Sequence, residues 1–228
     1  MKLFLDSADV GEIHNHFSTG LIDGVTTNPT LIRKSGRKPQ DVYRELMLMG
    51  VPDVSMEIVG NAPFIVSEAH KLVEEFGEMC TIKLPMSREG LQACSELSKE
   101  NIRTNVPLIF SAAQAILAAK AGAYYVSPFV GRCDDNSVAG LEVVRSVAEV
   151  YGRHRVSTQV LSASIRDVYK VTRSFYNGAD VVTIPPKIFE KMYDHVLTRE
   201  GLAIFDKDWA EFAVDPEPLP KTPFHEQV

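Results

Sequence analysis

A lysine inside an apolar run has the clearest chemical potential in this sequence. Lys83 lies in the segment Thr81–Pro85 (TIKLP), which follows Cys80 and is typical of a buried strand. Burial disfavours the charged ammonium and lowers its pKa, which yields a neutral amine that attacks carbonyl carbons and forms a Schiff base. A lysine at a strand end can instead extend its ammonium to solvent. The segment alone leaves both interpretations open.

Two carboxylates and two arginines supply the other groups that such chemistry needs. Schiff-base formation requires proton transfers at the substrate hydroxyl and at the departing water, which Asp6 and Glu57 are suited to carry out without a metal. Arg132 and Arg166, with Ser164 at a helix start, have the donors to bind a phosphate. Single arginines often form solvated surface ion pairs, so this alternative stays open.

Eight short runs rich in β-branched and aromatic residues are candidates for the strands that position these groups. Segments with helical spacing separate them, as in the helix expected around Val66 to Phe76. This alternation predicts an α/β fold with a parallel sheet, and eight units predict a closed (β/α)8 TIM barrel. An open doubly wound sheet is the alternative, weakened by the lack of a Gly-x-Gly-x-x-Gly turn. The runs are Leu3–Leu5, Gly24–Thr27, Val54–Ile58, Thr81–Leu84, Val106–Phe110, Tyr124–Ser127, Val156–Leu161 and Val181–Ile184.

Polar residues accompany seven of the eight predicted strands. In a barrel, functional side chains gather at the carboxyl ends of the strands. Each residue also has a simpler explanation: Asp6 could cap a helix near Ala8, and Asn28 before Pro29 could form a turn. Together they favour one common site and a reactive amine at Lys83. In strand order they are Asp6, Thr27 and Asn28, Glu57, Lys83, Asn105, Ser127 with Arg132, and Ser164 with Arg166.

Two further helices are predicted after the eighth strand, over Ile188–Leu197 and Gly201–Phe212. A helix left over after barrel closure needs a surface to pack on, so we expect it to contact its own barrel or a neighbouring subunit of a homo-oligomer. We predict one barrel domain over 1–212, with this additional C-terminal helix. Prolines among charged residues predict a loosely ordered tail over 213–228.

The composition favours a soluble protein that acts on small molecules. The 228 residues, 45% hydrophobic and 24% charged, suit one sizeable domain. A net charge of -6 without a dense basic run argues against nucleic acid and anionic membranes as partners. The widely spaced Cys80, Cys94 and Cys133 fit neither a zinc site nor a disulfide framework, so we expect a reducing, cytoplasmic location. Met1–Leu5 is too short for a signal-peptide core, and no apolar stretch approaches the roughly 18 residues of a membrane span.

Four segments of the chain resemble the transaldolase family: Leu5-Asp6, Gly24–Pro29 (GVTTNP), Ile82–Pro85 (IKLP) and Ala121–Arg132, which ends in SPFVGR. The resemblance covers nearly the whole chain. The compact size of the chain is similar to that of the small bacterial and phage-type members of the family, which include the fructose-6-phosphate aldolases. It implies an enzyme without cofactor or metal, and an assembly of five subunits or of ten.

The resemblance also implies roles for individual residues. Lys83 would form the Schiff base with C2 of fructose 6-phosphate or sedoheptulose 7-phosphate, substrates of the pentose phosphate pathway. Asp6 would take the proton of the C4 hydroxyl, Glu57 would work through a water, and the lysine-bound dihydroxyacetone unit would pass to an aldose phosphate. Asn28, Asn105 and Ser127 would hold the hydroxyls of this unit. The implied substrate-binding residues are Thr27, Asn28, Asn105, Ser127, Phe129, Arg132, Ser164 and Arg166, the last three of these at the phosphate.

Three positions refine this interpretation. At positions 57 and 129 this chain resembles transaldolases, which have glutamate and phenylalanine there, as in Glu57 and Phe129. The similar fructose-6-phosphate aldolases have glutamine and tyrosine at these positions. Pro107 departs from the family pattern, which has a threonine that helps to hold the catalytic water. Proline also removes a backbone donor from a central strand, which is awkward unless a bulge absorbs it. A fructose-6-phosphate aldolase, or a weakly active or inactive sugar-phosphate-binding homologue, therefore remains as an alternative.

Overall fold

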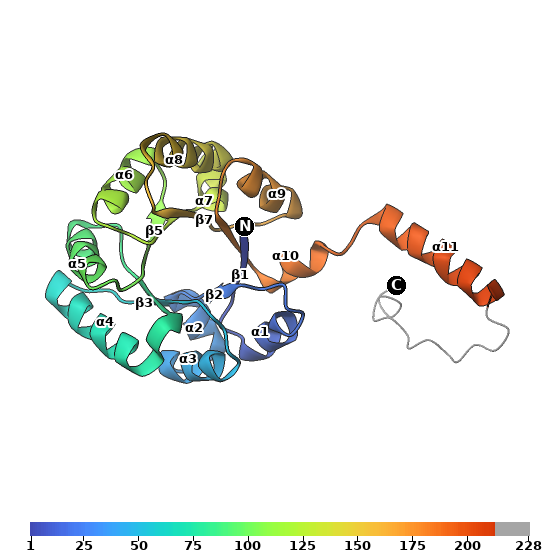
Figure 1. Ribbon diagram of the computed structural model, residues 1–228, viewed down its shortest axis with the longest axis horizontal. Helices are drawn as coiled ribbons and strands as arrows, with labels where there is room; N and C mark the ends of the chain where they lie inside the picture. Colours follow the sequence, from blue (N-terminus) through green and yellow to red (C-terminus); the bar gives the residue numbers. More distant parts are fainter. Residues whose placement is uncertain (213–228) are drawn as a thin grey trace. The chain divides into compact units, whose positions relative to one another are not determined.

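The computed structural model describes residues 1–212 and forms a closed barrel of eight parallel strands in sequence order (Figure 1). Each strand pairs with the next along the chain, and β1 pairs with β8 to close the ring. The (β/α)8 architecture predicted from the sequence is confirmed. The strands are β1 Lys2–Asp6, β2 Gly24–Thr26, β3 Val54–Glu57, β4 Cys80–Lys83, β5 Thr104–Ile109, β6 Tyr125–Pro128, β7 Gln159–Ser162 and β8 Val181–Ile184.

The helices that connect one strand to the next form a ring around the strands (Figure 1). Side chains that accept a hydrogen bond from a backbone N–H in the first turn start several of them, including Asn61 at α4 and Ser87 at α5. The helices are α1 Val10–Phe17, α2 Pro29–Ser35, α3 Pro39–Leu48, α4 Ala62–Phe76, α5 Arg88–Lys99, α6 Ala112–Lys120, α7 Val130–Asp135, α8 Gly140–His154, α9 Val168–Tyr176, α10 Pro186–Lys191 and α11 Val196–Phe212, with a short 3-10 turn at Gly77–Met79.

A small cluster of large side chains fills the barrel beneath its carboxyl-terminal mouth. Phe4 and Tyr125 meet edge to face, with ring centroids 6.2 Å apart. The Tyr125 hydroxyl donates to the buried carboxylate of Asp53 at 2.9 Å, and Thr81 and Arg103 donate to the same carboxylate. This network gives the site above it a closed floor.

Several element boundaries differ from the prediction. β5 begins at Thr104, so Asn105 lies within the strand, and β7 begins at Gln159 rather than at Val156. The helix predicted to end at Leu197 is two helices, since α10 ends at Lys191. α11 then runs through Gly201, because one glycine inside a helix costs only about 1 kcal/mol relative to alanine.

The chain divides into two compact units, Met1–Phe189 and the part from Glu190 onward. The first is the barrel; the described part of the second contains α11. The single domain over 1–212 stays a prediction, and the predicted tail at 213–228 lies outside the described residues.

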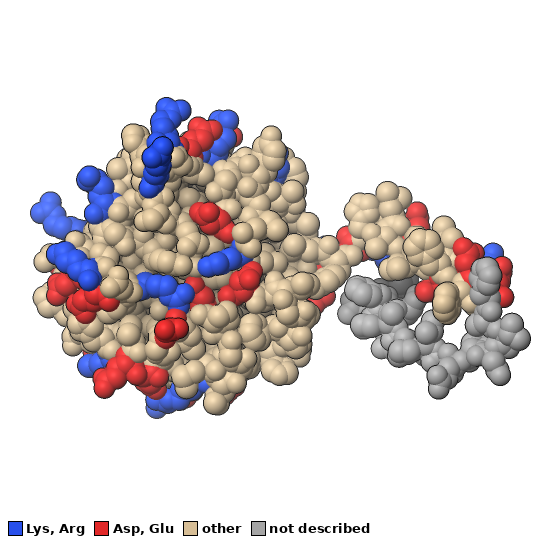
Figure 2. Space-filling model, viewed as in Figure 1, with Lys and Arg blue, Asp and Glu red and all other residues tan. Residues whose placement is uncertain are grey.

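None of the helices within residues 1–212 is long and apolar enough to cross a membrane. Figure 2 shows acidic and basic side chains lying next to each other over much of the visible barrel face.

Candidate active site

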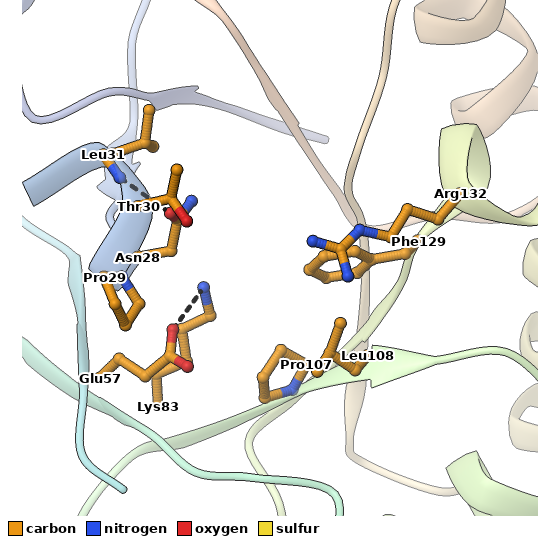
Figure 3. Close-up of a pocket in the computed structure, with 10 residues that line it drawn as sticks. All are labelled: Asn28, Pro29, Thr30, Leu31, Glu57, Lys83, Pro107, Leu108, Phe129 and Arg132. Atoms are coloured by element: carbon orange, nitrogen blue, oxygen red, sulfur yellow. Dashed lines mark hydrogen bonds and ion pairs between the residues drawn. The ribbon is translucent and has the colours of Figure 1, made fainter. Parts of the chain in front are cut away.

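A cavity with two adjoining lobes opens at the carboxyl ends of the strands, and Figure 3 shows residues that line the larger lobe. The larger lobe has a volume of about 330 Å³ and the smaller one about 150 Å³. Four residues line both lobes: Asn28, Lys83, Phe129 and Arg132. The larger lobe adds Glu57 and Pro107, and the smaller adds Asp6, Asn105, Ser127, Ser164 and two threonines, Thr26 and Thr183.

Lys83 lies at the junction of the two lobes, with only 5% of its surface exposed. Its Nζ donates to the backbone carbonyl of Thr27 at 2.9 Å and lies 3.3 Å from Glu57 Oε2. The pairing of β3 with β4 places Glu57 directly beside Lys83. The side chain therefore stays inside the barrel, and the alternative of a lysine that extends to solvent is wrong.

Asp6 faces the smaller lobe from the end of β1 and accepts a hydrogen bond from Thr26 Oγ1 at 2.8 Å. Burial raises the pKa of Asp6 above its ordinary value, while the Thr26 hydrogen bond and the charge of Lys83 oppose the rise. Asp9, not Asp6, caps the following helix, because its carboxylate accepts from the backbone N–H of Glu12. Asp6 is therefore left to serve the cavity.

Three buried polar side chains form a linked wall on β3, β5 and β6. Ser127 Oγ donates to Asn105 Oδ1 at 2.7 Å, and Asn105 Nδ2 donates to Ser55 Oγ at 3.2 Å. The pairing of β4 with β5 sets Asn105 beside Lys83. Across the cavity, Asn28 Oδ1 accepts from the backbone N–H of Leu31, which fixes the amide at the start of α2 (Figure 3). This arrangement suits a ligand with several hydroxyl groups.

The structure places Thr27 differently from the other predicted residues. Its hydroxyl donates to the carbonyl of Ser55 at 2.9 Å and lies 3.3 Å from the Tyr43 hydroxyl, behind the cavity wall. Thr27 does not line either lobe. Only its carbonyl serves the site, as the acceptor for Lys83.

The three residues predicted to bind phosphate are only partly assembled. The Arg132 guanidinium lies over the Phe129 ring, 5.4 Å from its centroid, and faces the cavity (Figure 3). Ser164 lines the smaller lobe. Arg166 does not line the cavity; both terminal nitrogens of its half-exposed side chain pair with Asp135. It lies against Gly131, where an added Cβ would be 2.7 Å from Arg166 Nε and 2.4 Å from the Ser164 carbonyl.

A bulge in β5 accommodates Pro107. The pairing of β5 with β6 passes from Val106 opposite Val126 to Ile109 opposite Pro128, so β5 has one extra residue there. Leu108, within the bulge, has a φ of 58°, in the left-handed region. The β4–β5 pairing stops at Asn105, two residues before the proline. Irregular backbone thus accommodates Pro107, which lines the larger lobe together with Glu57.

Sequence reasoning missed Thr26 and Thr183. Thr26 lies beside Asp6 in the β1–β2 pairing, and its hydroxyl is 2.7 Å from that of Thr183 on β8. Thr183 stands inside an apolar run, where a threonine looks like an ordinary strand residue. The available signal was its position next to the last residue of the eighth strand, the one strand to which no polar residue had been assigned.

The arrangement sets one amine between two carboxylates, with Asp6 in the smaller lobe and Glu57 in the larger. A carbonyl carbon held at Lys83 would have an acid/base group on each side. Within residues 1–212, no group of three or more His, Cys, Asp or Glu side chains is placed to hold a metal ion. The geometry suits nucleophilic addition of the amine to a carbonyl, followed by proton transfers.

Comparison with known proteins agrees with this geometry. Residues 3–217 match the family described as Transaldolase/Fructose-6-phosphate aldolase. The chain belongs to this family. It is 46% identical over 211 residues to a probable transaldolase of Caulobacter vibrioides (strain NA1000 / CB15N), covering 92% of this chain and 97% of the relative. It is 45% identical over 212 residues to a probable transaldolase of Paracoccus denitrificans (strain Pd 1222), with the same coverage. The family resemblance of the four sequence segments is thereby confirmed.

The raised pKa of Asp6 makes a prediction about stability. A carboxyl group with a raised folded-state pKa destabilises the fold at pH values above that pKa, and the penalty vanishes below the unfolded value of about 3.8. We expect Asp6→Asn to increase the free energy of unfolding at pH 7 and to lose this advantage as the pH falls toward 4. Urea unfolding at several pH values measures it, with exposed Asp41→Asn as the control. A constant difference across this range would contradict the prediction.

Proposed function

We propose that this protein is a transaldolase that transfers a dihydroxyacetone unit from a ketose phosphate to an aldose phosphate through a Schiff base on Lys83. The observation that carries the proposal is the buried Nζ of Lys83 at the junction of two lobes, with a carboxylate in each. Membership of the transaldolase/fructose-6-phosphate aldolase family supports it. By this function the protein belongs to the pentose phosphate pathway.

In the proposed reaction, the Lys83 amine attacks C2 of fructose 6-phosphate or sedoheptulose 7-phosphate and water leaves. Asp6 then takes the proton of the C4 hydroxyl, the C3–C4 bond breaks, and its electrons form an enamine on the lysine. An aldose phosphate departs. The enamine adds to the aldehyde carbon of the acceptor, Asp6 returns the proton to the new hydroxyl, and water releases the product. Glu57, 3.3 Å from Nζ, serves the steps that involve water.

The residues assigned to the substrate in this proposal all line the smaller lobe, except Arg166. Asn105 and Ser127 bind hydroxyls of the dihydroxyacetone unit, and Asn28 does so from the opposite wall. Arg132 and Ser164 hold the phosphate. Arg166 joins them when the phosphate competes with Asp135 for its guanidinium, because phosphate offers the same forked geometry as a carboxylate.

Transfer is favoured over simple aldol cleavage by the side chain at 129. Phe129 lines both lobes and packs edge to face with Phe110, with centroids 6.3 Å apart. A phenyl ring has no proton to give to the enamine, whereas a tyrosine hydroxyl would have one. The enamine is therefore left to react with the acceptor aldehyde. A fructose-6-phosphate aldolase remains the second candidate.

Borohydride trapping tests the chemistry directly. Incubation with fructose 6-phosphate followed by reduction is expected to add the mass of a reduced sugar adduct to Lys83, located by peptide mass spectrometry. Lys83→Met should abolish the adduct and reduce turnover by at least about 1000-fold, because no other group replaces the nucleophile. Lys71→Met, which changes an exposed lysine, is the matched control. Labelling of the wild-type protein at any site except Lys83 would exclude the mechanism.

A coupled assay with and without erythrose 4-phosphate separates the two candidate reactions. A transaldolase consumes fructose 6-phosphate only when the acceptor is present. Release of free dihydroxyacetone at a comparable rate without acceptor would instead identify an aldolase. Binding of the sugar phosphate without any adduct would indicate an inactive homologue.

Pro107 provides a second prediction, about rate. The bulge places a ring without a donor in the same lobe as Glu57, where a threonine hydroxyl would help to hold water. We expect Pro107→Thr to raise kcat for transfer by about threefold to tenfold, since one hydrogen bond to water contributes about 1 kcal/mol. Steady-state kinetics at saturating acceptor measure the change, with Pro52→Thr as a control substitution outside both lobes. An unchanged or lower kcat would contradict this role of the proline.

We also propose a cytoplasmic homo-oligomer of five or ten subunits. α11 carries exposed Leu202, Phe205 and Trp209 at helical spacing, which suits a contact with another subunit. The free cysteines are buried, as in proteins of reducing compartments. Light scattering is expected to give a mass of at least five subunits, and Phe205→Glu with Trp209→Glu should lower it. A monomeric mass for the wild type would contradict the proposal.

A further inference from the structure

The eighth strand brings a hydroxyl to the active site for which the proposed reaction has no role. Thr183 lines the smaller lobe and is 2% exposed, as is Thr26. β2 and β8 flank β1 on its two sides, with Thr26 beside Asp6 and Thr183 beside Phe4. The two hydroxyl oxygens meet 2.7 Å apart across β1. Three consecutive strands of the ring thus supply one hydrogen-bonded chain that ends at Asp6.

Counting hydrogens gives this chain a direction. A threonine hydroxyl has one hydrogen to donate, and an ionised carboxylate can only accept. Thr26 donates its hydrogen to Asp6 Oδ1 at 2.8 Å, so it has none left for Thr183. Thr183 must therefore donate to Thr26. A hydroxyl that receives a hydrogen bond becomes a better donor, because polarisation strengthens successive bonds in a chain.

We propose that Thr183 is a positioning residue for Asp6, acting through Thr26. The inference rests on the proposed function, in which Asp6 carries the proton of the C4 hydroxyl. With Thr183 donating to it, the Thr26 hydrogen stays directed at Oδ1. Oδ2 of Asp6 is then the oxygen that accepts the substrate proton.

This assignment fixes the path of one proton in each half of the reaction. During cleavage the proton passes from the C4 hydroxyl to Oδ2 as the C3–C4 bond breaks and C4 becomes an aldehyde. During transfer the same proton passes from Oδ2 to the aldehyde oxygen of the acceptor as the new bond forms. The chain keeps Oδ1 occupied throughout, so the proton stays on Oδ2.

The charged groups around Asp6 also influence its pKa, so they must be considered before a pH measurement is interpreted. Lys83 on β4 lowers the pKa of Asp6, and Arg132 of α7 lines the same lobe. Glu57 on β3 lies beyond Lys83, in the other lobe. The group that contacts Asp6 from β2 and the one behind it on β8 are uncharged hydroxyls. A substitution at Thr183 therefore changes hydrogen bonding to Asp6 without changing charge.

Four single variants test the inference. Thr183→Val keeps the shape and removes the donor, and Thr183→Ser restores it. Thr183→Ala replaces the valine variant if that protein does not fold. Thr158→Val is the matched control, since Thr158 is also buried and donates to the Ala123 carbonyl, outside the cavity. The readouts are ¹³C NMR titration of the Asp6 carboxyl carbon, identified by its loss in Asp6→Asn, and the pH dependence of kcat/KM.

We expect Thr183→Val to raise the pKa of Asp6 by about half a unit, because Thr26 becomes a weaker donor to the ionised carboxylate. The acidic limb of kcat/KM should move to higher pH by the same amount, with kcat reduced by about threefold to tenfold. Thr183→Ser should return the Asp6 pKa and the acidic limb to their wild-type positions and kcat to within about twofold of the wild type. Thr158→Val should leave the acidic limb in place.

An Asp6 titration that is the same in Thr183→Val as in the wild type would overturn the inference, as would an equal shift in Thr158→Val. The two proposals fail separately. The NMR titration requires no turnover, so a shift at Asp6 in a protein without transfer activity would refute the proposed function and keep the role of Thr183.

Discussion

The active site depends on the accommodation of the Lys83 amine inside the barrel. Transferring an ammonium from water into a protein interior is costly unless it finds partners. Here the backbone supplies one, the Thr27 carbonyl, and the adjacent strand supplies the other, Glu57. Both positions follow from strand pairing, since β3 and β4 align Glu57 with Lys83, and β4 and β5 align Lys83 with Asn105. Parallel pairing of neighbouring strands is therefore what brings these groups to one level.

Two of the five non-glycine residues with a positive φ in the described part of the chain border the cavity that holds this amine. Leu108 and Ser164 both adopt positive φ values, at 58° and 59°, and both line the cavity. Non-glycine residues in this region cost on the order of 1–3 kcal/mol each, and they persist only where surrounding structure holds them. The Ser164 carbonyl is held by the backbone N–H of Gly131, where no side chain would fit. The irregular backbone at Ser164 is therefore supported by the first turn of α7.

The sequence was sufficient for the barrel and for most of the site, because both depend on local patterns. Apolar runs separated by helical spacing identify strands, and the barrel rule then places Asp6, Glu57 and Lys83 at one mouth. The sequence was insufficient where a tertiary contact decides which way a side chain points. Arg166 pairs with Asp135 rather than lining the cavity, and Thr27 contributes a carbonyl rather than a hydroxyl. Gly201 suggested a helix start, yet the helix passes through it.

The pairing of Arg166 with Asp135 also bears on the balance of charge at the mouth. Asp6 and Glu57 are offset by Lys83 and Arg132 when all four are ionised, so the lined cavity has little net charge to attract a phosphate. A phosphate brings a charge of about -2 near neutral pH. Arg166 adds its positive charge to the site only when its ion pair with Asp135 breaks and its guanidinium binds the phosphate instead. Because both partners are half exposed, solvent screens their attraction and the exchange costs little. The exposed ion pair thus holds a guanidinium beside Gly131 and Ser164, close to the cavity, where the proposed function places the phosphate.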